Sequence, residues 1–187
     1  VGISYGTLEV FNIDLGSGDE VFNVRGTTAV TNLNTHEGDD RIYVSSEAAV
    51  DQLAKTTLDF LTGHLDDLNG TLNINVGAGR HLLMISDEAA TVGDGTNIDP
   101  VLITDVNSAA QAKDATLSNN AEISIIGLAT GSISYAADPT GNFADGITLW
   151  TGYGDDTINI NGTHHRSGLR TITTLNTGLG DDNVTVN

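Results

Sequence analysis

The stretch LWTGYGDDTININ at 149–161 returns as LNTGLGDDNVTVN at 175–187, and its second glycines, Gly154 and Gly180, are 26 residues apart. Each copy places Gly-x-Gly-Asp-Asp between two runs in which apolar and polar residues alternate. Alternation with a period of two is typical of β-strands, while glycine and aspartate are typical of tight turns. The sequence therefore predicts a repeated unit of strand, turn and strand.

Further segments fit the same template at 10–24, 30–44 and 72–85, and a sixth at 122–135 keeps the strand pattern without the acids. Equivalent turn positions are separated by 20, 41, 50, 25 and 26 residues, which indicates a unit of 20–26 residues. This length suits two or three short strands and is below the ~30 residues of a strand–helix–strand crossover. We predict an all-β fold, a right-handed parallel β-solenoid of the β-helix or β-roll type. An antiparallel sandwich is the alternative.

Two segments interrupt the repeat. Apolar residues three to five positions apart over 46–68 predict one inserted amphipathic helix, with Ser46 as its N-cap. The segment 100–121 is predicted to be an irregular insert with a weak helical pattern. The whole of 1–187 is then a single solenoid segment, and its strand-like ends favour a section of a larger protein.

The charge balance excludes several classes of partner. The chain has 25 Asp and Glu residues against 7 Lys and Arg, which gives a net charge of −18. Nucleic acids and anionic membranes require a basic surface, so we expect neither as a partner. No apolar run reaches the ~18 residues of a membrane span, so membrane insertion is not expected either. With no cysteine, disulfides and thiolate metal sites are excluded, and the carboxylates favour cations.

The acidic turns predict a calcium site. Stacked units place equivalent turns about 4.8 Å apart, where two carboxylates repel each other by roughly 3 kcal/mol at an effective dielectric near 20. Oxygen ligands without thiolates select a hard ion, and Ca²⁺ accepts six to eight irregular oxygen ligands. The alternative is that Gly-Asp-Asp is only turn chemistry.

The candidate calcium ligands share one position, the acidic Gly-x-Gly turn. They are Gly16, Gly18, Asp19, Glu20, Gly38, Asp39, Asp40, Gly152, Gly154, Asp155, Asp156, Gly178, Gly180, Asp181 and Asp182. The turn at 77–81 carries Arg80 and His81 in place of the acids, so we expect no calcium there.

These turns resemble the calcium-binding repeat of RTX (haemolysin-type) proteins, Gly-Gly-x-Gly-x-Asp-x-U-x with U apolar. In TGYGDDTIN the second glycine, third glycine, aspartate and U correspond to Gly152, Gly154, Asp156 and Ile158. The motif's first glycine is replaced by Thr151, and the units are longer than tandem nonapeptides.

The resemblance implies a parallel β-roll in which Ca²⁺ binds between successive turns. Carried onto this sequence, it pairs Asp156 with Asp182 at one site and Glu20 with Asp40 at another.

Taken together, these features predict a structural, calcium-stabilised extracellular segment, a stalk, adhesin or filament component at the cell surface. The sequence leaves two alternatives for the partner: end-to-end self-association, or contact with other surface or matrix components. Calcium is plentiful outside the cell, so ligand linkage favours folding after export. The alternative is a polysaccharide-binding or polysaccharide-degrading β-helix module, since glycosidases use paired carboxylates. We assign no catalytic residue, because the acids recur in turns, and we expect His164 and His165 in a surface loop.

Overall fold

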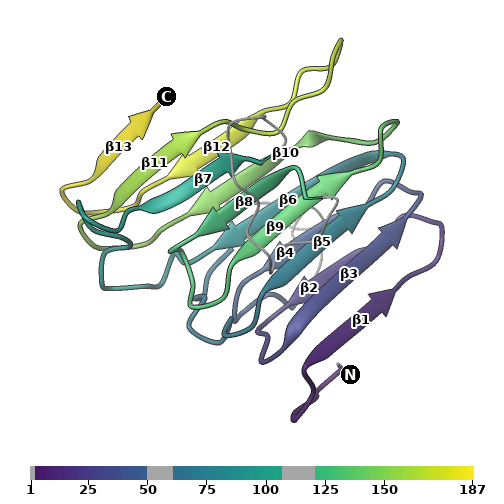
Figure 1. The fold of residues 1–187 in the computed structure, drawn as a ribbon, viewed down its shortest axis with the longest axis horizontal. Helices are drawn as coiled ribbons and strands as arrows, with labels where there is room; N and C mark the ends of the chain where they lie inside the picture. The colour runs from purple at the N-terminus through teal and green to yellow at the C-terminus, as the bar shows by residue number, and fades with distance from the viewer. Residues whose placement is uncertain (1–2, 50–60, 107–120) are drawn as a thin grey trace.

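The computed structural model describes residues 3–49, 61–106 and 121–187. In this part of the chain, thirteen strands form two sheets and there is no helix (Figure 1). Short runs in which Val, Ile, Leu and Thr alternate with Asn form these strands. Val, Ile and Thr pack well on a pleated, half-buried surface, and several of the Asn side chains bond to Asn side chains of the neighbouring strand.

The larger sheet has eight strands. In spatial order they are β1 (Val10–Asp14), β3 (Val30–His36), β5 (Leu72–Val76), β9 (Ile133–Ala137), β8 (Ile123–Ile126), β7 (Val101–Asp105), β11 (Thr157–Asn161) and β13 (Asn183–Val186). The smaller sheet has five parallel strands, in the order β12 (Thr173–Asn176), β10 (Asn142–Trp150), β6 (Arg80–Ser86), β4 (Arg41–Val44) and β2 (Val21–Val24).

Equivalent strands of successive repeat units pair in parallel. Val10 of β1 lies beside Val30 of β3, and Val21 of β2 lies beside Arg41 of β4. The same relation holds between β11 and β13 and between β10 and β12. The spacing of the sequence repeat therefore sets the register of the strands.

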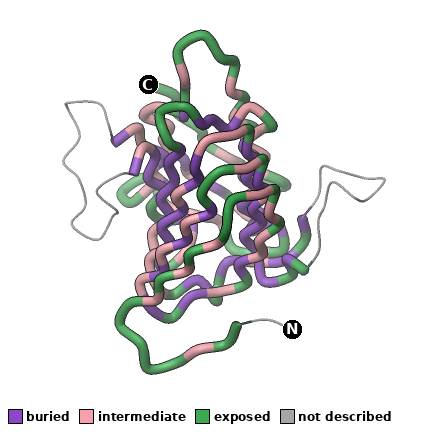
Figure 2. The backbone as a smooth tube through the Cα atoms, turned by 90° about the vertical axis from the view of Figure 1, so that its right-hand side faces the viewer, coloured by how far each residue is buried: buried purple, intermediate pink, exposed green. Residues whose placement is uncertain are grey.

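The core lies between the two sheets. Buried side chains of the larger sheet meet those of the smaller sheet in one cluster, which includes Leu33, Ile74, Ile42, Leu83 and Ile147. Each fully buried side chain of this size contributes roughly 1.5–3 kcal/mol. Figure 2 shows buried positions running along the strands, while the first residues and many of the turns are exposed. A second apolar cluster, which includes Tyr43, Leu61 and Met84, is buried on the outer face of the smaller sheet.

The prediction of a right-handed parallel β-solenoid is wrong. The larger sheet is mixed, because β8 runs antiparallel to both of its neighbours, β7 and β9. Five of the six repeat segments cross from one sheet to the other, whereas the segment 122–135 folds back within one sheet. This segment is the one that lacks the acidic turn.

The predicted inserts also differ from the structure. Within 46–68, the described residues 46–49 and 61–68 form no helix, and 50–60 lie outside the described residues. Leu61, Leu65 and Leu68 are nevertheless buried, so their apolar spacing reflects packing without helical structure. Within 100–121, residues 101–105 form strand β7, and 107–120 lie outside the described residues.

Candidate functional site: two columns of acidic turns

The Gly-x-Gly turns stand in two columns at opposite ends of the strands. Column I contains the turns 16–20, 36–40 and 77–81, which lead from the larger sheet to the smaller one. Column II contains the turns 152–156 and 178–182, which lead from the smaller sheet back to the larger one. The sequence treats these turns as equivalent, but the fold divides them into two sites.

Glycine is required because successive turns lie almost in contact. Gly38 has φ +150°, and a Cβ built on it would lie 1.5 Å from the carbonyl oxygen of Gly18. Gly180 has φ +153°, and its Cβ would lie 1.9 Å from the carbonyl oxygen of Gly154. No side chain fits at either position, and L-residues avoid these backbone angles.

The first acid of each turn accepts a hydrogen bond from the next turn. In column I the backbone N–H of Asp39 donates to Asp19 Oδ1 at 2.9 Å, and that of Arg80 donates to Asp39 Oδ1 at 2.8 Å. In column II the N–H of Asp181 donates to Asp155 Oδ1 at 2.9 Å. These first acids are exposed.

The second acid accepts its hydrogen bond in the opposite direction, from the preceding turn. The N–H of Glu20 donates to Asp40 Oδ1 at 3.1 Å, and that of Asp156 donates to Asp182 Oδ1 at 3.0 Å. Asp40 and Asp156 are buried. A hydrogen bond to a charged group contributes about 1.5–3 kcal/mol, so each acid ties two turns together.

A threonine completes the environment of the buried acid. Thr35 Oγ1 donates to Asp40 Oδ2 at 2.5 Å, and Thr151 Oγ1 donates to Asp156 Oδ2. Both oxygens of Asp40 and of Asp156 therefore accept hydrogen bonds from the protein itself. These threonines stand where the RTX motif has its first glycine. Sequence reasoning treated that replacement as a departure and missed its role.

The structure brings together the acid pairs that the resemblance implied. Glu20 contacts Asp40, and Asp156 contacts Asp182, in each case through a backbone N–H and a carboxylate. Among the residues that the structure describes, no group of three or more His, Cys, Asp and Glu side chains converges as a metal site. Calcium at these turns stays a prediction.

The turn 77–81 ends column I with a different chemistry. His81 is fully buried, with Nδ1 3.2 Å from Asp40 Oδ2 and Nε2 3.1 Å from the carbonyl oxygen of Gly77. A carbonyl oxygen only accepts, so Nε2 carries a proton. The guanidinium of Arg80 reaches Asp145 of β10 at 2.7 Å.

A second group of acids lies beside column II. The N–H of Asp94 donates to Asp156 Oδ1 at 2.7 Å, while Asp94 Oδ2 is buried with no hydrogen-bond partner among the described residues. Burial, and then the carboxylates of Asp87, Asp156 and Asp66, raise the pKa of Asp94 to about 8. Sequence reasoning missed Asp94, although Gly93-Asp94-Gly95 repeats part of the turn motif.

Asp87 shares this environment. Its Oδ1 accepts the N–H of Leu65 at 2.6 Å, yet burial raises the pKa of Asp87 to about 6. Within the described ranges no ion pair involves Asp87, Asp94 or Asp156. We call these three residues the column II acid group. Its negative charge is the least compensated feature of the site.

His164 does not lie in an exposed loop as expected. It is 3% exposed, and its Nε2 donates to Glu122 Oε2 at 3.1 Å. Arg166 donates to both oxygens of Glu122, at 2.5 and 2.9 Å. Burial alone would raise the pKa of Glu122, but the hydrogen bonds from His164 and Arg166 lower this pKa to about 2. His165 is exposed, as predicted.

No family model, no curated protein and no solved structure matches this chain. Among the described residues, no helix is long and apolar enough to cross a bilayer. The functional proposal therefore depends on the geometry of the two columns.

Proposed function

We propose that this chain is a structural segment of an extracellular stalk, adhesin or filament, and that calcium stabilises it. The observation that carries the proposal is the pair of carboxylate–amide ladders in columns I and II. In successive turns, carboxylates at equivalent positions accept backbone N–H groups of the neighbouring turn and so bind one turn to the next.

Repetition of this kind favours a mechanical role over catalysis. An enzyme needs a unique constellation of groups around one reacting atom. Here equivalent acids make equivalent bonds in both columns, and the resulting ladders hold the strands in register. The polysaccharide module stays a prediction from the sequence.

The column II acid group is the candidate calcium site of this proposal because its acids are the least compensated, although its three side chains do not converge as a metal site in the described part of the chain. Asp94 Oδ2 is buried without a partner, and Asp87 and Asp156 add negative charge beside it. A bound Ca²⁺ would supply positive charge to oxygen ligands, which it prefers. Asp94 and Asp87 are the residues that would hold it, whereas Asp156 already accepts two hydrogen bonds.

Calcium availability supports an extracellular location. A ligand that binds only the folded state stabilises it by RT ln(1 + [L]/Kd), about 2.7 kcal/mol at a hundred times Kd. Millimolar calcium outside the cell meets this condition for a weak site, and cytoplasmic calcium does not. The large excess of Asp and Glu over Lys and Arg is compatible with a calcium-rich extracellular medium.

Calorimetric titration with Ca²⁺ at pH 8 tests the proposal. We expect binding to the wild type, at least tenfold weaker binding to Asp94→Asn, and unchanged binding to the control Asp99→Asn, which alters an exposed acid in the same connection. Equal calcium affinity in wild type and Asp94→Asn would place the ion elsewhere. The absence of any binding heat and of any calcium effect on melting would overturn the calcium part of the proposal.

A further inference from the structure

The neighbouring strands β7 and β11 carry surfaces of opposite charge at their two ends. The segment 87–106, which leads into β7 and includes it, contains five Asp or Glu residues and no Lys, Arg or His. The segment 157–180, which begins with β11, contains two Arg and two His residues and no Asp or Glu. Because β7 and β11 pair in parallel, the connection before β7 and the loop after β11 lie at opposite ends of these strands.

The loop 162–172, which follows β11 and which we call the cationic loop, projects beyond the ends of the strands (Figure 1). Its tip is a tight turn in which the N–H of Leu169 donates to the carbonyl oxygen of Arg166 at 3.2 Å. This turn presents Leu169, which is 48% exposed, and the exposed Arg170. No ion pair joins Arg170 to another residue of the described chain.

The base of the cationic loop is fixed to the body of the protein. Arg166 Nε donates to the carbonyl oxygen of Gly141 at 3.1 Å, and Arg166 Nη2 donates to that of Ala137 at 2.9 Å. Arg166 and His164 also bind Glu122, which compensates their charge. A surface that is already ordered loses less conformational entropy when it binds a partner. The loop therefore offers Leu169 and Arg170 in a fixed arrangement.

The opposite end of the strand pair carries a second closed turn, within residues 91–99, which we call the acidic turn. Thr96 Oγ1 accepts the N–H groups of Ile98 and Asp99 at 3.3 and 3.0 Å, and the N–H of Thr96 donates to the carbonyl oxygen of Asp99 at 2.8 Å. These bonds hold Ile98 at 97% exposure beside the exposed Asp99. Val92 in the same segment is 78% exposed. Apolar side chains exposed together among charged residues are typical of a contact surface.

The cationic loop and the acidic turn are complementary. Each presents an apolar side chain next to a charged one, Leu169 next to Arg170 in the loop and Ile98 next to Asp99 in the turn. Opposite charges steer association and disfavour partners of the wrong sign. Within one molecule the two surfaces lie at opposite ends of β7 and β11, so each can be covered only by another molecule.

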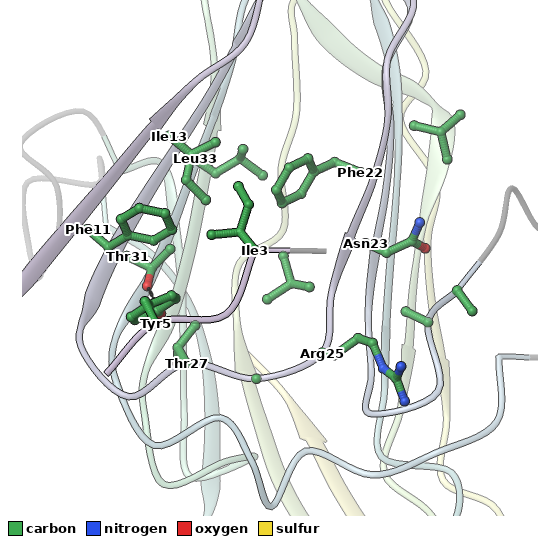
Figure 3. Close-up of a pocket in the computed structure, with 15 residues that line it drawn as sticks. Ile3, Tyr5, Phe11, Ile13, Phe22, Asn23, Arg25, Thr27, Thr31 and Leu33 are labelled. Atoms are coloured by element: carbon green, nitrogen blue, oxygen red, sulfur yellow. Dashed lines mark hydrogen bonds between the residues drawn. The ribbon is translucent and has the colours of Figure 1, made fainter. Parts of the chain in front are cut away.

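The apolar groove of about 730 Å³ between β1 and β2 is not a comparable contact surface. Figure 3 shows Ile3 between Ile13 and Phe22, in the middle of this groove. The hydroxyl of Tyr5 bonds to Thr31 Oγ1 at 2.8 Å, which holds the first described residues over the groove. These residues occupy the place that a partner would take.

We infer that the partner of this chain is a second copy of itself, bound with its acidic turn against the cationic loop. Leu169 of one copy packs on Ile98 of the next, and Arg170 pairs with Asp99. This inference rests on the structural role proposed above and names the partner for that role. Since each copy uses two different surfaces at opposite ends of its strands, the contact continues into an open filament along the strand direction. The contact is small and therefore weak.

Reversal of the paired charges tests the inference by sedimentation velocity in 0.15 M NaCl with EDTA. We expect wild type to form species larger than dimers as its concentration rises to the millimolar range. Arg170→Glu and Asp99→Arg should each weaken association at least tenfold, because each places like charges in the contact. The double variant Arg170→Glu/Asp99→Arg should associate like wild type, because it reverses the pair and keeps the net charge of −18.

These variants separate the contact from general charge repulsion. Asp99→Arg lowers the net negative charge, so a purely repulsive effect would strengthen association, whereas the contact predicts weaker association. Ile98→Ser should also weaken association at least tenfold without changing the charge. Ile3→Ser is its matched control, since it alters an exposed isoleucine outside both surfaces and should leave association unchanged. The substituted side chains are exposed, so all variants should melt within a few degrees of wild type.

Other outcomes overturn the inference. A wild type that remains monomeric at millimolar concentration excludes the contact, and so does undiminished association of Arg170→Glu, Asp99→Arg or Ile98→Ser. A folded double variant that associates no better than the single charge variants also excludes it. Because EDTA is present throughout, failure of this contact and failure of the calcium proposal give separate results.

Discussion

The hydroxyl of Thr35 donates to the carboxylate of Asp40 inside one turn, across 2.5 Å, while the N–H of Glu20 in the preceding turn donates to the other oxygen. Thr151 and Asp156 repeat this relation in column II. The buried acid therefore joins a bond within its turn to a bond between turns. A carboxylate used in this way is a structural element of the fold.

Removing the hydroxyl of Thr35 should destabilise the protein. Thr35→Val keeps the volume but leaves an oxygen of the buried Asp40 with one donor fewer, at a cost of about 1–3 kcal/mol. Urea denaturation measures this cost. Thr28→Val is the control, because Thr28 is exposed in the connection between β2 and β3. This substitution should change the free energy of unfolding by less than about 0.5 kcal/mol. Equal effects of the two substitutions would contradict the role assigned to Thr35.

Close stacking of the turns makes Gly38 irreplaceable. We expect Gly38→Ala to cost about 3 kcal/mol or more, because its Cβ would overlap the carbonyl oxygen of Gly18. Gly146→Ala is the matched control, since Gly146 also has positive φ, +113°, with nothing within 4 Å of its Cβ. That substitution carries only backbone strain, about 1–2 kcal/mol. Thermal unfolding of both variants separates crowding from strain.

The column II acid group should make the protein less stable as pH rises. The folded-state pKa values of Asp87 and Asp94 are raised to about 6 and about 8, above the ~3.9 of an unfolded aspartate. Between these values the folded state binds more protons than the unfolded state, so stability falls from about pH 4 to pH 8. Melting in EDTA across this range checks the slope. Asp94→Asn should flatten its upper part, and an unchanged slope would contradict the assignment.

The hydrogen bonds of Glu122 with His164 and Arg166 should make the protein less stable as pH falls, the opposite of the effect of the column II acid group. Hydrogen bonds from His164 and Arg166 hold the pKa of Glu122 at about 2, against ~4.3 for an unfolded glutamate, although burial works against them. The stability that Glu122 contributes is present above about pH 4 and is lost as pH falls towards 2. Glu122→Gln should remove this part of the acid transition. If Glu122→Gln unfolds in acid at the same pH as wild type, the role assigned to Glu122 is excluded.

The sequence repeat predicts much of the local structure but little of the global arrangement. Alternation and spacing predict the strand–turn–strand units and the neighbours of β1, β2, β10 and β11. They do not distinguish column I from column II. The same turn motif can lead from the larger sheet to the smaller one or from the smaller sheet to the larger one. The segment 122–135 folds back within one sheet at a turn without acids. The repeat pattern derived from the other copies predicts instead that this segment continues the uniform repeat.

The site was partly visible in the sequence. Asp40 and Asp156 follow a repeated motif, and the threonines five positions before them recur in three copies, at Thr35, Thr151 and Thr177. Asp94 and the contact between Glu122 and His164 could not be predicted in the same way. They join residues 62 and 42 positions apart in the chain, and only the packing of the sheets brings them together.

The melting temperature at pH 8 in millimolar calcium and in EDTA tests the central claim most directly. The account predicts a higher melting temperature in calcium, by several degrees, for wild type and for Asp99→Asn, and a much smaller difference for Asp94→Asn. A wild-type melting temperature that is the same in calcium and in EDTA would contradict it.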